Sequence, residues 1–504
     1  MSDELRQGPD SNKTRLEEVL DDRKFFGHPR GVGALAAGNF FNSFAWGALY
    51  AILIYYLYSP YTHGLGFTQG QAASMVTAMG ACNSIFVILG SWLADRVLGM
   101  RKALIIGNIV KGTAFGLLAI PAFTLTQGRV FAIIGLFLMS LPIMGASNAS
   151  LTGQLYRKND NGRRDAAFTI HTIGNNIAGL IAPVLVAQIG MKNYHVGFLI
   201  AAVAAFLYGA VIFFTQHKFF GPLGEKPIKP LEPGRFGKMF VRFVLVLIAV
   251  IGIIVALVLT KVISFQGVLN IITSATFIIP IVFLANLLSK KDLTAVDRRR
   301  MKPFLKLFAA QIVMALCGVM LTSMVAIFID QKIDRHIFGI EVAPGSVGTI
   351  YTVLGLVLAP VFVWLWTKTR ATHIRTTYKY GLGILFTALG YGLLTIPIVL
   401  FKDQAPYSLL WMVFYYLFLT FSDNLVGPIG LSFVVKLSPD AYHTQMQTAW
   451  GQAGTIGNGI ALVLFNFYQT ADQQVNLFPI MTALLVVTAL FIFAFSKNVE
   501  KDMV

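Results

Sequence analysis

The hydrophobic residues of this chain fall into long runs that short polar connectors separate. Each run is close to, or longer than, the roughly 20 apolar residues that an α-helix needs to cross a bilayer. The pattern predicts about fourteen such helices, near residues 34–58, 71–95, 102–122, 129–155, 166–190, 195–216, 239–261, 265–289, 303–329, 345–367, 376–400, 406–436, 443–468 and 475–497. Backbone polar groups inside a bilayer need partners within their own segment, so the predicted fold is an all-α polytopic membrane protein.

Lysine and arginine are spread unevenly over the connectors. They are concentrated in one set, which includes residues 157–164, 290–302 and 367–379, and they are sparse in the alternating set, which includes residues 59–70 and 468–475. Basic connectors stay on the cytoplasmic side of a membrane. Both termini are therefore expected in the cytoplasm of a multi-pass cell-membrane protein, and an even number of spans agrees with this orientation.

Composition narrows the class of protein further. Hydrophobic residues make up 56% of the chain and charged residues only 12%, whereas a soluble domain has about 25% charged residues. The net charge of +17 does not indicate a nucleic-acid-binding protein, because the basic side chains lie in the connectors and form no basic helix or stacked aromatic pattern. Cys82 and Cys317 lie inside apolar runs without metal-ligand spacing, which is typical of small core residues.

The runs divide into two sets of six, with an insertion between the sets. The expected organisation is a cytoplasmic tail at 1–30, a six-helix bundle at 31–216, a linker with two additional helices at 217–302, a second six-helix bundle at 303–497 and a cytoplasmic tail at 498–504. The first tail has no apolar core, so it is not a signal peptide. Two helical halves around a central cavity are the architecture of carriers that alternate access to a midplane site.

The stretch GSWLADRVLGMRK at 90–102 follows the second predicted span. Its pattern, Gly-x-x-x-Asp-Arg-x-x-Gly-x-[Arg/Lys], resembles the cytoplasmic motif of the major facilitator superfamily. Asp95 can pair with basic residues at neighbouring helix ends in one state of such a carrier, while Gly90 and Gly99 let backbones approach and turn. We therefore expect Asp95 and Arg96 to take part in gating.

Three longer stretches resemble one family within that superfamily, the proton-dependent oligopeptide transporters. They are LTGQLYRKNDNGRRDAAFTIHTIGNNIAGLIAP at 151–183, LVLAPVFVWLW at 356–366 and FSDNLVGPIGLSFVVKLSPDAYHTQMQTAWGQAGTIGN at 421–458. The two additional central helices are also usual in the bacterial members of that family. The resemblance implies the major facilitator fold and the uptake of di- and tripeptides together with protons.

The first span departs from the pattern of that family, whose members carry E-x-x-E-R there. The aligned residues are Asn39, Asn42 and Ser43, and the fourth-span lysine of the family aligns with Gly145. Asparagine forms hydrogen bonds but cannot titrate. The first span thus keeps its polarity and lacks the groups that would move a proton or bind a peptide carboxylate.

Other positions of the family pattern keep a polar or aromatic residue. Asp423 replaces the tenth-span glutamate of the family's amine-binding position, and Tyr351 replaces an eighth-span asparagine. The resemblance implies a substrate site that includes Asp423, Asn39, Asn42, Tyr156, Asn176, Tyr351 and Trp450. Helix packing, interface anchoring and helix–helix hydrogen bonding are the alternative roles for the aromatic and amide side chains.

Three charged or histidine side chains lie away from the ends of the predicted spans, where a charge costs roughly 2.5–3.5 kcal/mol, so each is a functional candidate. Asp423 is one, with a buried structural ion pair as its alternative role. Lys111 is a candidate for proton coupling or substrate contact, and its alternatives are snorkelling or a structural pair. His171 is a coupling candidate because histidine titrates near neutral pH, but it lies close enough to a helix end to contact headgroups or a carbonyl.

The leading hypothesis is a secondary active, proton-coupled di/tripeptide symporter that works by alternating access. The alternative is a proton-independent facilitator or exchanger of a non-peptide polar solute, because the coupling acids and the carboxylate-binding cations of the family are replaced. No H-E-x-x-H, G-x-S-x-G or G-x-x-x-x-G-K-[ST] motif occurs, so neither an enzyme nor an ATP-driven pump is expected. The expected partners are the lipid bilayer, a small solute or short peptide, and protons, with no cofactor, metal or nucleic acid, and the chain is expected to act as a monomer.

Overall fold

The computed structural model describes residues 9–157, 160–227, 264–290, 293–337, 339–369, 374–401, 405–439 and 443–503, with short pieces between residues 241 and 260. Almost all of these residues are helical, and 11 of the helices found among them are long and apolar enough to cross a membrane. Most of the predicted span at 239–261 and part of the predicted linker lie outside the described residues. The rest of the chain agrees with the predicted all-α pattern of membrane helices.

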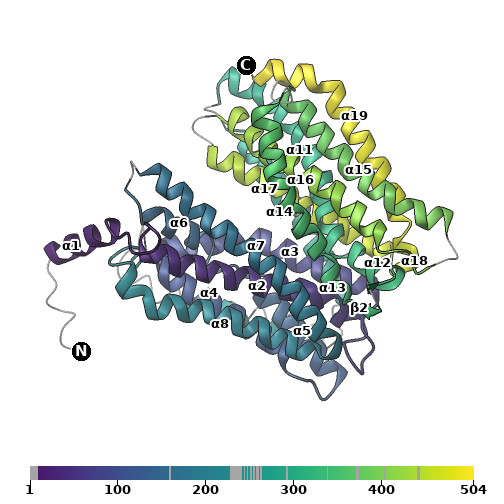
Figure 1. The fold of residues 1–504 in the computed structure, drawn as a ribbon, viewed down its shortest axis with the longest axis horizontal. Coiled ribbons are helices and arrows are strands. Elements are labelled where there is room, and N and C mark those ends of the chain that lie inside the picture. The colour runs from purple at the N-terminus through teal and green to yellow at the C-terminus, as the bar shows by residue number, and fades with distance from the viewer. Residues whose placement is uncertain are drawn as a thin grey trace. The chain divides into compact units, whose positions relative to one another are not determined.

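The chain forms two compact units, each of which contains a bundle of helices (Figure 1). Unit 1 comprises residues Met1–Ile52 and Ile85–Ser264, and unit 2 comprises Leu53–Ser84 and Phe265–Val504. The helices of unit 1 are α1 (Pro9–Leu20), most of α2 (Arg30–Tyr58), the end of α3 (Gln69–Leu93), η2 (Ala94–Leu98), α4 (Met100–Ala119), α5 (Leu125–Met139), α6 (Ser147–Gln154), α7 (Asn161–Lys192) and α8 (Tyr194–Phe219). The domain boundaries expected at 216 and 303 remain a prediction.

Unit 2 contains the remaining elements. They are the end of α2, most of α3, α10 (Phe265–Leu288), α11 (Ala295–Thr322), α12 (Met324–Lys332), β1 (His336–Ile337), β2 (Ile340–Glu341), α13 (Pro344–Val347), α14 (Thr349–Lys368), α15 (Thr376–Leu400), α16 (Leu410–Leu437), α17 (His443–Phe467), α18 (Ala471–Gln474) and α19 (Leu477–Met503). Helix α15 packs between α16 and α19, and α11 packs against α17. The expected C-terminal tail continues α19 as helix up to Met503.

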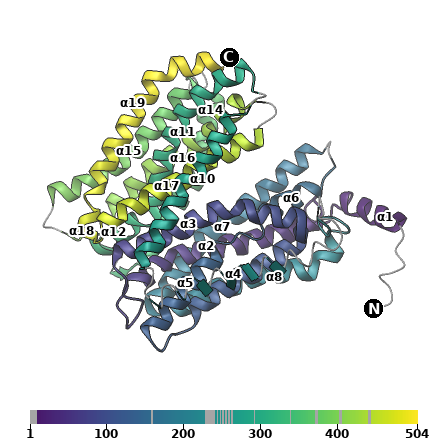
Figure 2. The ribbon, with the colours of Figure 1, turned by 180° about the vertical axis from the view of Figure 1, so that it is seen from behind.

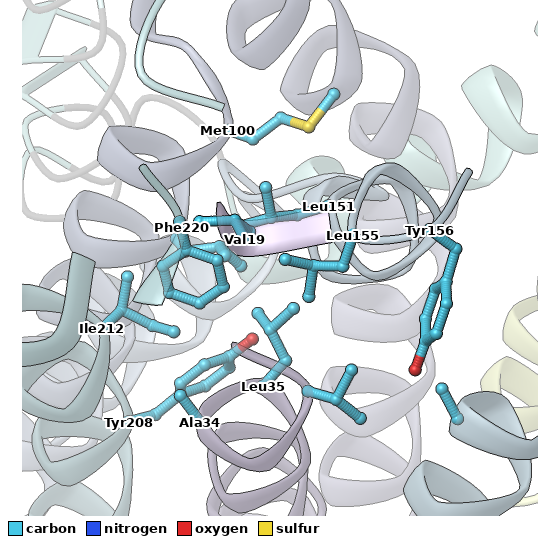
Figure 3. Packing of buried hydrophobic residues seen from close by; sticks show 13 residues of the cluster. Val19, Ala34, Leu35, Met100, Leu151, Leu155, Tyr156, Tyr208, Ile212 and Phe220 are labelled. Carbon is cyan, nitrogen blue, oxygen red and sulfur yellow. The ribbon is translucent and has the colours of Figure 1, made fainter. Parts of the chain in front are cut away.

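The core of unit 1 is built around α4, which packs along α8 and also contacts α5 and α6. At one end, buried aromatic and aliphatic side chains from six segments form a cluster, in which Phe220 and Tyr208 lie near Leu35, Leu155 and Val19 (Figure 3). Burial of each such large side chain stabilises the fold by about 1.5–3 kcal/mol. Val19 belongs to the segment predicted as a tail, so part of that segment is packed into the unit.

Ion pairs and hydrogen bonds continue this packing through residues 21–30. Asp22 accepts hydrogen bonds from the backbone and the side chain of Arg30, at 3.1 and 2.9 Å. Arg157 pairs with Asp21 at 2.8 Å, and Arg163 donates to the carbonyl of Gly27. The end of the N-terminal segment is thus attached to the first turns of α2 and α7.

The fourth predicted span, at 129–155, is broken in the structure. Helix α5 ends at Met139, and α6 begins only at Ser147. In the turn between them, Gly145 has φ +46°, and the carbonyl of Pro142 lies so close to Gly90 that a side chain at Gly90 would collide with it. The prediction of one continuous helix was wrong, because hydrophobicity alone does not show where two backbones meet.

One of the two additional central helices is placed by the structure. Helix α10 packs along α17 within unit 2 (Figure 2). A Cβ at Gly459 of α17 would lie 2.1 Å from Thr276 Oγ1, and Gln266 donates to Asn466 at 2.6 Å. Leu269, Leu462 and Ala78 form a small apolar cluster beside these contacts. Helix α10 is therefore an integral part of unit 2.

Candidate functional site

In unit 1, the structure brings together two of the predicted site residues, Lys111 and Asn42. Lys111 lies midway along α4 and is buried, and its Nζ donates to Asn42 Oδ1 on α2 at 2.5 Å. The same Nζ lies 5.4 Å from the ring centre of Trp46, one turn further along α2. In the described part of the chain this ammonium makes no ion pair within 4.0 Å with a carboxylate. A neutral amide and an aromatic face therefore surround a buried amine.

The other amides near Asn42 are arranged less closely. Ser43 donates to Asn175 of α7 at 2.8 Å. The residue that aligns with the arginine of the E-x-x-E-R pattern therefore forms a hydrogen bond with a neighbouring helix. Asn39 and Asn176 are half-buried on α2 and α7. Neither has a side-chain hydrogen bond among the described residues. Their predicted contact with substrate remains a prediction.

In unit 2, the structure brings together Asp423 of α16 and Tyr351 of α14. The Tyr351 hydroxyl donates to a carboxylate oxygen of Asp423. The ring of Tyr351 lies 6.1 Å from that of Tyr416, on the same helix as Asp423. Asp423 keeps an exposed side chain, although its neighbour Ser422 is fully buried and bonded to Thr387. The carboxylate is thus oriented by a hydroxyl and remains accessible.

Two predicted substrate-contacting aromatics are packed inside their units. The Tyr156 hydroxyl is 2.6 Å from His28 Nδ1, and the guanidinium of Arg163 lies over its ring at 5.5 Å. Trp450 is buried beside Phe304 and Gly430. Packing accounts for every contact that these two side chains make here, so a substrate role for them rests on the resemblance alone.

His28 lies just before the first span, and its environment disfavours a charge. Burial, with a further effect from the Arg163 guanidinium, lowers the pKa of His28 below its usual value of 6.5. Neutral His28 pairs well with the Tyr156 hydroxyl, whereas a protonated ring would add a second cation near Arg163. Nothing in the sequence pattern singled out His28.

His171 lies near the start of α7 and is buried, with its ring 6.2 Å from that of Phe168. Its Nε2 atom has no hydrogen-bond partner among the described residues. Among the described residues no carboxylate bonds this ring, and its coupling role remains a prediction.

The charged residues of the stretch at 90–102 lie in two different environments. Asp95 and Arg96 are exposed on the short π-helix η2, so their predicted gating role remains a prediction. Arg101 is fully buried and donates to the carbonyls of Gly221 and Leu223 just after α8. Gly99, with φ +77°, provides the turn between η2 and α4.

A second charged cluster, which the sequence pattern did not reveal, lies at one end of unit 2. Arg335 contacts Asp330 at 3.4 Å and Glu341 at 3.2 Å, and it donates to the carbonyl of Val342 at 2.9 Å. Tyr58 donates to the other oxygen of Asp330. The only signal for this cluster was Asp330 at the end of a span. The pairing required the hairpin β1–β2, which is too short to predict. In the described residues, no group of three or more His, Cys, Asp or Glu side chains could hold a metal ion.

Comparison with known proteins decides the family. The family model described as the POT family matches residues 102–497, well over half of the chain. This chain belongs to the POT family. The predicted resemblance to the oligopeptide transporters is thereby confirmed.

Relatives of this POT family member match along nearly the whole chain. A di-/tripeptide transporter of Lactococcus lactis subsp. lactis (strain IL1403) is 28% identical over 96% of this chain and 98% of its own length. A peptide transporter of Yersinia enterocolitica is 26% identical over 90% of each chain.

Solved structures confirm the all-α polytopic membrane fold of this POT family member. The crystal structure of peptide transporter POT in complex with sulfate is 27% identical, with a TM-score of 0.89 over 98% of this chain and 99% of that chain. A POT family transporter in complex with 5-aminolevulinic acid is 26% identical, with a TM-score of 0.84 over 96% and 99% of the two chains. This protein is therefore a multi-pass membrane protein with a transporter fold.

Proposed function

We propose that this protein is a secondary active transporter that takes up di- and tripeptides with protons by alternating access. Its family membership and the names of its relatives support peptides as the substrate class. The orientation of the basic connectors supports cytoplasmic termini in the cell membrane. A carrier that exposes its substrate site to each side of the membrane in turn would move the peptide without ATP.

The observation that best supports the substrate class is the exposed carboxylate of Asp423. It lies inside a membrane-spanning helix, and Tyr351 orients it. Within the described residues it has no ion pair within 4.0 Å with a protein cation. A peptide ammonium would supply the missing counter-charge and would form charge-assisted hydrogen bonds with the free carboxylate oxygen.

The proposal is tested by comparing a dipeptide with its N-acetyl derivative, which lacks the ammonium. Binding of both to purified protein is measured for the wild type, Asp423→Asn and the matched control Asp165→Asn, whose carboxylate is exposed at the start of α7. Loss of one charge-assisted contact costs about 1.5–3 kcal/mol, or roughly 10–100-fold in Kd.

If Asp423 binds the peptide ammonium, the effect of acetylation on affinity should differ between the wild type and Asp423→Asn. Acetylation should weaken binding to the wild type and to Asp165→Asn by at least about tenfold and should change little in Asp423→Asn, because that variant has already lost the contact. Equal loss on acetylation in all three proteins would remove Asp423 from the site. Binding of neither ligand to the wild type would contradict peptide transport itself.

A further inference from the structure

The amine of Lys111 raises a question that the proposed function leaves open, namely which group carries the proton. Lys111 is buried near the middle of α4 and bonds an amide at 2.5 Å instead of a carboxylate. Lysine can carry a proton, and asparagine cannot. Of Lys111 and Asn42, only Lys111 can therefore gain or lose a proton. This inference rests on the proposed function, because it concerns the coupling of the same transport cycle.

Within the described residues of unit 1, the charged and titratable groups of the surrounding helices leave Lys111 without a fixed negative partner. Helices α2, α4, α5, α6 and α8 contain no Asp or Glu. The nearest acids along the chain are Asp95 on η2 and Asp160 just before α7, and Asp160 pairs with Arg163. Asp95 and the next acid, Asp165 in the first turns of α7, are exposed near helix ends. The other titratable groups of these elements are Arg30, Tyr50, Tyr55, Tyr56, Tyr58, Arg96, Arg101, Lys102, Arg129, Arg163, Arg164, His171, Lys192, Tyr194, His195, Tyr208, His217 and Lys218.

Of these groups, those that lie deepest along the helices are tyrosines with other contacts. Tyr50 stacks on Trp46 at 5.7 Å, and Tyr208 bonds Asn148 of α6. Arg101 precedes Lys111 by ten residues on α4, about 15 Å along a helix, and its guanidinium is bound to backbone carbonyls after α8. None of these contacts holds Lys111 in one charge state as a paired carboxylate would.

Asn42 is suited to bond Lys111 in both of its charge states. The ammonium donates to Asn42 Oδ1, as in this structure. A neutral amine has a lone pair, which can accept from Asn42 Nδ2 once the amide turns over. An aspartate at this position would accept only, and it would favour the charged lysine. The amide therefore lets the lysine gain and lose a proton without leaving a buried polar group unpaired.

We infer that Lys111 is the proton-carrying group of this transporter and that Asn42 is its partner in both charge states. In the loading step, the lone pair of neutral Lys111 takes a proton from water on one side of the membrane, and the resulting ammonium donates to Asn42 Oδ1. In the release step, the ammonium gives that proton to water on the other side, and the freed lone pair accepts from Asn42 Nδ2. One proton is moved, and no other bond changes.

The inference is tested in liposomes with two assays that separate coupling from peptide exchange. A trapped pH indicator reports acidification of the lumen when dialanine is added outside. Counterflow of labelled against unlabelled dialanine reports exchange, which requires no net proton movement. The variants are Lys111→Gln and Asn42→Asp, with Lys102→Gln as a control, because Lys102 is exposed at the start of the same helix.

The expected pattern depends on chemistry and not on side-chain size. Acidification should fall at least about tenfold in Lys111→Gln and in Asn42→Asp while counterflow persists, because one variant has no titratable amine and the other pairs it permanently. Lys102→Gln should acidify the lumen as the wild type does. Thermal unfolding identifies any variant that fails to fold. If Lys111→Gln does not fold, acidification by Asn42→Asp tests the inference by itself.

Two outcomes would overturn the inference and leave the proposed function standing. They are undiminished acidification in Lys111→Gln and undiminished acidification in a folded Asn42→Asp. Absence of counterflow in the wild type, or counterflow without any acidification, would instead contradict the proposed function, so the two failures are distinguishable.

Discussion

Four candidate residues selected individually from the sequence form two contacting pairs in the structure. Asp423 and Tyr351 are 72 positions apart, and Lys111 and Asn42 are 69 apart. The family resemblance identified Asp423, Tyr351 and Asn42 as candidates. The free-energy cost of placing a charge inside a membrane identified Lys111. Which residues touch could not be derived, because helix rotation and depth depend on packing.

For Tyr156 and Trp450, contact with substrate remains a prediction. Both align with positions that line a cavity in the family, and both are packed against protein neighbours here. His28, the partner of Tyr156, lies in the segment predicted to be a cytoplasmic tail. A polar sequence does not show whether one of its residues is buried against a distant hydroxyl.

The His28–Tyr156 contact predicts a pH dependence of stability. Burial lowers the pKa of His28 in the folded protein below 6.5, so the unfolded chain takes up the proton first as pH falls. The stability from neutral His28 is fully present above about pH 6.5 and is lost as pH decreases toward the folded pKa. Thermal unfolding at pH 7.5 and 5.0 should show a smaller decrease in Tm for His28→Gln than for the wild type. Equal decreases in the two proteins would mean that His28 does not contribute.

The contacts of Arg335 predict that its substitution lowers the free energy of unfolding more than substitution of nearby Lys332 does. Arg335 is largely covered and contacts Asp330, Glu341 and a backbone carbonyl, so Arg335→Gln should lower the free energy of unfolding by about 1–3 kcal/mol. Lys332 pairs with the mostly exposed Asp472, and Lys332→Gln should cost less than about 1 kcal/mol. Chemical unfolding of both variants measures the two values. A larger loss for Lys332→Gln would contradict the assigned role of Arg335.

At the scale of helices, hydrophobic periodicity predicted the existence of spans better than their continuity. The run at 129–155 became α5 and α6, and the run at 303–329 continues after a break at Ser323 into α12. The first of these breaks accompanies the close approach of Pro142 to Gly90 on α3. Such breaks depend on a partner that is distant in sequence, so a local pattern cannot locate them.

The close packing of α10 on α17 predicts unequal effects of two glycine substitutions on one helix. A Cβ at Gly459 would lie 2.1 Å from Thr276 Oγ1, whereas a Cβ at Gly454 meets nothing within 4 Å. Gly459→Ala should therefore destabilise the protein by about 1–3 kcal/mol, and Gly454→Ala should be neutral or stabilising by up to about 1 kcal/mol. Thermal unfolding in one detergent compares them, and equal Tm values would mean that α10 does not pack closely here.

At the scale of the whole molecule, the all-α membrane fold and the family followed from the sequence. The run lengths and the sparse charge gave the class, and the stretches at 151–183, 356–366 and 421–458 gave the family. Orientation and coupling are properties of the protein in a membrane, and the fold alone does not reveal them.

The predicted orientation is tested by placing single cysteines in two connectors. In a background with Cys82 and Cys317 replaced by serine, Thr126→Cys and Arg298→Cys both place the thiol at an exposed position. If basic connectors are cytoplasmic, a membrane-impermeant maleimide added to intact cells should label position 126 and not position 298. The reverse pattern would place the termini outside the cell.

The central claim is that this protein accumulates short peptides at the expense of a proton gradient. The most direct test is uptake of labelled dialanine into liposomes that contain the purified protein, with an inward proton gradient imposed. The account predicts accumulation above the external concentration, its collapse on adding a protonophore, and loss of uptake in Asp423→Asn but not in Asp165→Asn. Absence of dialanine uptake, or uptake that only equilibrates and ignores the gradient, would contradict it.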